Sequence, residues 1–140
     1  MIRLATEDRT ELFEYLKEEY YSKCEEEYPD MVYTDEQIML MLDFCEDRTI
    51  VIRNPDIQCV AIYMTLTDET YKNISVDKVM DVNSLGQMLE EKGNNFHFFL
   101  VTSKSYRGIM IAMREAKKLK PSSVSWCDPD MSQIHQYNLN

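Results

Sequence analysis

Apolar positions in the first third of the chain repeat at helical spacing. Leu12 and Leu16 lie on one side of a segment that we expect to be helical over residues 7–21. A second helix is expected to open at Thr34, because Gln37 stands three residues later, as in a capping box. Together with a short alternating stretch at the N-terminus, the pattern predicts a strand followed by two amphipathic helices.

The middle of the chain carries longer apolar runs rich in β-branched residues, which are typical of strands. Residues 48–53 and 59–67 are two such runs, and the turn-forming residues 54–56 separate them, so we expect a hairpin. The second run is almost wholly apolar, as a central strand covered on both faces would be. A third run, at residues 95–102, predicts another buried strand.

Helical and strand patterns alternate again in the C-terminal part. Apolar residues within 79–89 are spaced as in a helix that ends near Gly93, and those within 109–119 predict a second, one-sided helix. Residues 123–128 and 133–139 then predict two short strands. The expected order is strand, two helices, two strands, helix, strand, helix and two strands.

Length and charge limit the classes of protein that this order could represent. The 140 residues suffice for one domain, which we expect to span 1–140. With 25 acidic and 15 basic residues the net charge is -10, which argues against direct contact with nucleic acid or an anionic membrane and leaves a basic protein surface as a partner. No apolar run approaches the length of a membrane span, and the N-terminus is unlike a signal peptide, so we expect a soluble, cytoplasmic protein.

The residues that commonly bind metals are few and scattered. The four cysteines are far apart in the sequence, no C-x-x-C occurs, and only His97 and His135 are available as imidazole ligands. We therefore expect reduced thiols and no metal site.

Two stretches, MIRLATEDRTELFEYL at the start and SYRGIMIA at residues 105–112, together with the order of elements, resemble the GNAT superfamily of N-acyltransferases. The resemblance implies an α/β fold, more narrowly α+β. Its central sheet would be mixed and mostly antiparallel, with about six strands and with helices on both faces. It also implies acetyl-CoA as the possible cofactor.

The family usually carries R-x-x-G-x-G or R-x-x-G-x-A between its fourth strand and the next helix, where backbone N–H groups bind the coenzyme pyrophosphate. Arg107, Gly108 and Ala112 fit this pattern, whereas Met110 occupies the place of the central glycine. The alternative is an ordinary surface turn with basic residues. The residues that the resemblance implies for coenzyme binding are Val101, Ser103, Lys104, Ser105, Tyr106, Arg107, Gly108 and Ala112.

Catalysis by such enzymes needs a base and an acid near that turn. His97 is the candidate base and Tyr137 the candidate acid, with Tyr106 as a further choice of acid. The alternative is that His97 is a hydrogen-bonded, inert residue of a strand and that the tyrosines only pack. We also expect that the chain after residue 128 is too short for the late helix that carries the acid in the family.

The segment SSVSWCDPDMSQIHQYNLN further resembles GNAT-like proteins of tailed bacteriophages. The sequence therefore favours a non-catalytic GNAT-like protein that binds a protein partner, such as a phage virion or assembly protein. The first alternative is an acetyl-CoA-dependent N-acetyltransferase that acts on an amine or a protein. The second is an acidic inhibitor of a nucleic-acid-binding protein, suggested by the net charge and the run EEEYPD.

Overall fold

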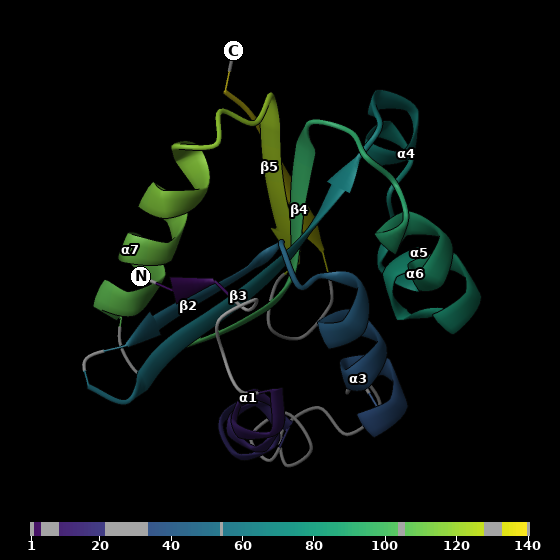
Figure 1. Cartoon of the computed structure of the whole chain (residues 1–140). Coiled ribbons are helices and arrows are strands. Elements are labelled where there is room, and N and C mark those ends of the chain that lie inside the picture. The colour runs from purple at the N-terminus through teal and green to yellow at the C-terminus, as the bar shows by residue number, and fades with distance from the viewer. Residues whose placement is uncertain are drawn as a thin grey trace.

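The computed structural model describes residues 2–3, 9–21, 34–53, 55–103, 106–127 and 133–139, whose helices and strands are shown in Figure 1. The strands are β1 (Ile2–Arg3), β2 (Thr49–Arg53), β3 (Ile57–Leu66), β4 (Asn95–Ser103), β5 (Ser123–Cys127) and β6 (Ile134–Asn138). The helices are α1 (Arg9–Leu16), the π-helix η2 (Lys17–Tyr21), α3 (Asp35–Phe44), α4 (Asp68–Lys72), α5 (Val76–Met80), α6 (Val82–Leu89) and α7 (Tyr106–Lys117). Along the described residues, the order of elements agrees with the predicted one except between β3 and β4, where three helices replace the single predicted helix.

The strands form one mixed sheet in the order β1-β2-β3-β4-β5-β6. Neighbouring strands are antiparallel except β4 and β5, which are parallel and are connected through α7. The prediction of a mixed, mostly antiparallel sheet is confirmed. The expected number of about six strands is too high for the body of the sheet, which has five full strands in the described residues, because β1 adds only two residues at one edge.

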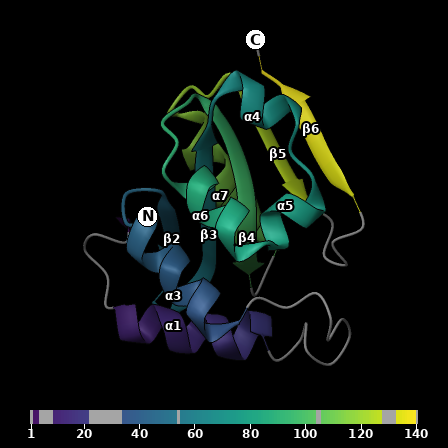
Figure 2. The same cartoon turned by 90° about the vertical axis from the view of Figure 1, so that its right-hand side faces the viewer.

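Helices cover both faces of the sheet, as predicted (Figures 1 and 2). Successive residues of β2 show the division, since Ile50 and Ile52 belong to the apolar cluster beneath α7, whereas Val51 belongs to the cluster beneath α1, α3 and α6. All three side chains are buried. The central strands therefore need apolar residues at both odd and even positions, because each set faces an apolar cluster. This explains the long apolar runs in the sequence.

The start of α3 follows the predicted capping box. The Gln37 backbone N–H donates to Thr34 Oγ1 at 3.1 Å, and the Thr34 N–H donates to Gln37 Oε1 at 2.7 Å. For the first helix, the predicted start at residues 7 and 8 lies outside the described residues, and its last turn has π-helical geometry.

The segment between β3 and β4 is more finely divided than predicted. In place of one helix it forms α4, α5 and α6, and each begins at a side chain that caps it, namely Thr67, Ser75 and Asp81. Such residues accept hydrogen bonds from the first free N–H groups of a helix and so favour repeated starts. Glu91 ties the segment together, because its carboxylate accepts the Thr67 N–H at 3.0 Å and the Thr70 hydroxyl at 2.7 Å.

A bulge divides β4 into two halves. Tyr63 of β3 lies opposite Phe98 while its neighbour Ile62 lies opposite Leu100, so Phe99 is the extra residue. Phe98 faces the α7 side, whereas both Phe99 and Leu100 belong to the opposite cluster. The bulge thus bends β4 next to Phe98, the residue at which the pairing with β5 ends.

In the described part of the chain, no helix has both the length and the apolar character that crossing a membrane requires.

Candidate functional site

The turn between β4 and α7 lies where the sequence places it, beside a length of β4 that extends past β5. The ladder between the parallel strands runs from Asn95–Ser123 to Phe98–Trp126 and ends there. On its other side β4 stays paired with β3 as far as Ser103. The pairing of the two parallel strands therefore ends before Val101.

The two small residues of the predicted coenzyme motif serve in packing. A Cβ added to Gly108 would lie 2.5 Å from Ser103 Oγ and 3.1 Å from Cys59 Cβ, so this turn of α7 fits against the sheet only without a side chain. Ala112 is fully buried in the cluster beneath α7. Both residues are therefore explained by the contact between α7 and the sheet.

The other residues implied for coenzyme binding lie in different surroundings. The Ser103 hydroxyl donates to the Gln58 carbonyl at 3.2 Å, and Val101 packs against the cluster beneath α7. Arg107 is exposed. Lys104 and Ser105 lie outside the described residues, and Tyr106 forms the first residue of α7.

Met110 does not occupy the space beside β4. Its side chain is 48% exposed, on a part of α7 that faces away from the sheet. The turn consequently offers one described cation, Arg107, and the start of a helix, which by itself is a weak anion site.

His97 is enclosed in the core on the α4 side of the sheet. Its Nδ1 lies 2.7 Å from Ser125 Oγ, and its Nε2 has no hydrogen-bond partner among the described residues. Burial lowers the pKa of His97 to about 3, because the charged imidazolium would lose its hydration. A neutral ring without exposed surface has no access to a substrate amine, so the structure argues against His97 as the base and agrees with the inert alternative.

Tyr137 lies on β6, far from the turn. Val124 of β5 is opposite both Tyr137 and Phe96, so Tyr137 is level with the beginning of β4. Phe96 precedes Ser103 by seven residues, which at the rise of a strand is roughly 20 Å. The Tyr137 ring stacks on Trp126 at 4.9 Å between ring centroids, and it is 52% exposed. The structure does not bring the proposed acid to the proposed coenzyme turn.

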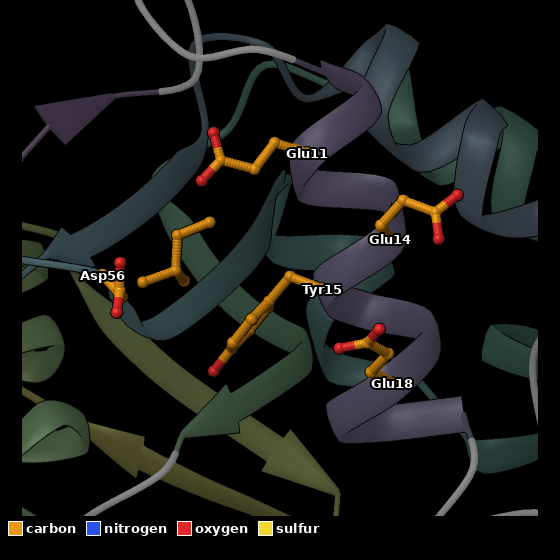
Figure 3. Close-up of a pocket in the computed structure, with 6 residues that line it drawn as sticks. Glu11, Glu14, Tyr15, Glu18 and Asp56 are labelled. Atoms are coloured by element: carbon orange, nitrogen blue, oxygen red, sulfur yellow. The ribbon is translucent and has the colours of Figure 1, made fainter.

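A shallow hollow with acidic walls lies beside α1, and the sequence patterns did not indicate it. It is lined by Glu11, Glu14, Tyr15, Glu18, Asp56 and Ile57. Figure 3 shows Glu11 and Asp56 on the side of the β2–β3 turn, whereas Glu14 projects from the other side of α1. Arg53 binds Glu11 at 3.0 Å and compensates part of this charge.

Tyr15 forms the floor of the hollow. Its hydroxyl donates to the Gln58 carbonyl at 3.3 Å, and burial raises the pKa of Tyr15 to about 12. The phenol is therefore held protonated by its surroundings, which suits a structural contact between α1 and β3 better than proton transfer.

Two of the described cysteines are held in the thiol form by burial. Among the described residues, Cys45, Cys59 and Cys127 form no disulfide bond. Burial raises the pKa of Cys45 to about 12 and that of Cys59 to about 11, so neither is a thiolate at neutral pH. Cys24 lies outside the described residues.

No known protein family matches the sequence, and no curated protein is similar to it.

Proposed function

We propose that this chain is a non-catalytic protein with a GNAT-like order of elements, and that it works by binding a protein partner. The observation that carries the proposal is the separation of the three parts that acyl transfer needs. The turn lies at the end of β4, the imidazole of His97 is buried behind the sheet, and Tyr137 is level with the start of β4. A scaffold can keep its order of elements without its active site.

The charge of the chain supports a partner with a basic contact surface. The net charge is -10, and carboxylates on α1 and at the β2–β3 turn line the hollow of Figure 3. Such a surface favours encounter with cationic protein segments and opposes encounter with nucleic acid. A phage virion or assembly protein is one setting for this role, on the resemblance of the C-terminal segment.

A second candidate is an acetyl-CoA-dependent N-acetyltransferase. One observation favours it, namely that β4 runs past the last β5 pair at Phe98 and α7 begins shortly after β4 ends. In this alternative the coenzyme would lie along the end of β4, with its pyrophosphate near the exposed Arg107.

Backbone amide resonances distinguish the two functions. We expect a lysine-rich and arginine-rich peptide to move the resonances of Glu11, Glu14 and Asp56, and acetyl-CoA to leave those of Arg107 and Gly108 in place. We also expect no change of melting temperature with acetyl-CoA. A ligand at 100 times its Kd would stabilise the native protein by about 2.7 kcal/mol, which is easily measured.

Two charge reversals on α7 give the control. If acetyl-CoA moves the Arg107 and Gly108 resonances, and Arg107→Glu abolishes the effect while Arg114→Glu keeps it, the coenzyme site exists and the non-catalytic proposal is wrong. Both arginines are exposed on the same helix, so the comparison removes general charge effects.

A further inference from the structure

The outer edge of the sheet at β6 lacks the features that keep edge strands apart. β6 is the last strand in the order of the sheet, so among the described residues no strand lies beyond it. Natural edge strands are usually short, or carry charges or proline. The opposite edge, β1, is two residues long, whereas β6 has five residues without Asp, Glu, Lys, Arg or Pro.

The absence of charge continues across the neighbouring strand. β5 has the sequence SVSWC and β6 the sequence IHQYN, in a chain of which 29% of the residues are charged. About three charged residues would be expected in ten at that proportion. The surface formed by these two strands therefore carries no formal charge, although the chain as a whole is acidic.

Aromatic rings gather on the α7 side of this surface. Trp126 of β5 stacks on Tyr137 at 4.9 Å and lies 6.0 Å from the His135 ring, both on β6. The main contacts of α7 are with β2, β3 and β4, so these rings extend beyond the part of the sheet that the helix covers. Tyr137 is 52% exposed and the adjacent Leu139 is also exposed.

The pairing of β5 with β6 determines which backbone groups of β6 point away from the sheet. The Leu139 N–H donates to the Ser122 carbonyl at 3.0 Å, and this pair continues the β5–β6 register. In an antiparallel ladder the backbone groups of alternate residues point to opposite sides of the strand. The N–H and C=O of Ile134 and Gln136 consequently point to the outer edge.

We propose that β6 pairs antiparallel with β6 of a second copy of this chain, about a twofold axis at Gln136. The axis makes Gln136 of the two copies a hydrogen-bonded pair and places His135 of each copy opposite Tyr137 of the other. Each Trp126 then ends a continuous row of aromatic rings that crosses the interface on the α7 side. The contact is isologous, so it closes at two copies.

Charge argues for a second copy over the basic partner of the proposed function. An edge without carboxylates gives a cationic strand no attraction. Two copies with a net charge of -10 each repel least where they meet through uncharged strands. The acidic helices α1 and α3 lie toward the other end of the sheet from β6 (Figure 2), which keeps their charges apart in the pair. This inference does not depend on the proposed function.

Measurement of the mass in solution tests the pairing. We expect light scattering to give twice the 16.6 kDa of the chain. Tyr137→Lys introduces a cation on each side of the axis and should give the mass of one chain. Met110→Lys is the matched control, because Met110 is a similarly exposed apolar residue on α7, and it should leave the mass doubled. Circular dichroism checks that both variants keep the fold.

Cross-linking tests the position of the axis. In a hydrogen-bonded antiparallel pair the two Cα atoms are about 5.5 Å apart, which a disulfide spans. Gln136→Cys should therefore give a covalent dimer with oxidised glutathione. Ile134→Cys should not, since the two substituted residues would be roughly 13 Å apart along the strands.

Three results would overturn the proposal. The first is a wild-type protein with the mass of one chain at every concentration that stays in solution. The second is a dimer that Tyr137→Lys leaves intact, because the interface would then lie elsewhere. The third is a mass that rises beyond that of two chains as the concentration increases, because a closed twofold pair cannot add a third chain.

Discussion

His97 and Ser125 form a buried hydrogen bond across the parallel strands β4 and β5, with 2.7 Å between Nδ1 and Oγ. The other ring nitrogen, Nε2, has no hydrogen-bond partner among the described residues. The neutral ring can satisfy Nδ1 in either tautomer through the Ser125 hydroxyl, which both donates and accepts. The imidazolium would need an acceptor at Nε2 as well, and burial therefore keeps the ring neutral.

This environment predicts a loss of stability in mild acid. Burial lowers the pKa of His97 in the folded protein from 6.5 to about 3. Above pH 6.5 the ring is neutral in both states and stability is full. As the pH falls from 6.5 toward 3, the unfolded chain binds a proton that the folded protein does not. The free energy of unfolding should then decrease by about 1.4 kcal/mol per pH unit from this group.

Urea denaturation at several pH values measures this slope. His97→Leu removes the titrating group and should make the free energy of unfolding depend less on pH between 6 and 4 than it does in the wild type. Equal slopes for wild type and His97→Leu would contradict the assignment.

Because His97 and Ser125 share a hydrogen bond, we predict that the effects of their replacements on the free energy of unfolding are coupled. Ser125→Ala would leave both nitrogens of the buried His97 ring without a partner among the described residues and should destabilise the protein by about 1–3 kcal/mol. The double replacement, with His97→Leu, removes both polar groups and should cost less than the sum of the single replacements. Urea unfolding of the four proteins gives the coupling free energy, expected at about 0.5–3 kcal/mol. Strict additivity would show that the bond contributes nothing.

We predict that adding a side chain at Gly108 causes a packing defect. A Cβ there would lie 2.5 Å from Ser103 Oγ, and that hydroxyl already donates to the Gln58 carbonyl. Gly108→Ala should therefore destabilise the protein by about 1–3 kcal/mol, as overpacking does. Thermal unfolding measures the change.

Gly86 is the control for that substitution. It lies within α6, and a Cβ added there would meet nothing within 4 Å. Gly86→Ala should stabilise the protein by up to about 1 kcal/mol, because alanine has the higher helix propensity. If Gly108→Ala were equally stabilising, the close contact between α7 and the sheet would be wrong.

We predict that Glu91 stabilises the start of α4. Its carboxylate accepts hydrogen bonds from the Thr67 N–H, the Thr67 hydroxyl and the Thr70 hydroxyl, at 3.0, 3.1 and 2.7 Å. Glu91→Ala should cost about 1–2 kcal/mol, in the range of a lost helix cap. Glu90→Ala changes an exposed neighbour and should be nearly neutral. A loss of equal size in both variants would indicate a general charge effect.

The elements that the sequence predicts well are those with strong periodicity. The long, mostly apolar runs of β3 and β4 indicate buried strands, and the Thr34 and Gln37 pair marks the start of α3 without tertiary information. The division of the segment before β4 into three helices was missed. Apolar spacing carries across Ser75 and Asp81, although each of them caps a new helix.

The candidate site could be predicted in position but not in chemistry. Arg107 and Gly108 lie in the first turn of α7 and Ala112 lies further along the same helix, but a spacing pattern does not tell whether a glycine makes room for a ligand or for a neighbouring strand. The burial of His97 and the pairing of His97 with Ser125 depend on the parallel register of β4 and β5, which forms between distant parts of the chain. No short turn fixes that register, because β4 and β5 are connected through α7.

The bulge in β4 has a consequence for comparing this strand with other sequences. Before Phe99 the even-numbered residues 96 and 98 face α7, and after it the odd-numbered Val101 and Ser103 do so. A protein of the same fold without the extra residue would present the same faces only if one position of β4 were skipped in the alignment. An ungapped alignment through this strand would match core residues of one protein with residues of the opposite face of the other, and would hide a true relationship.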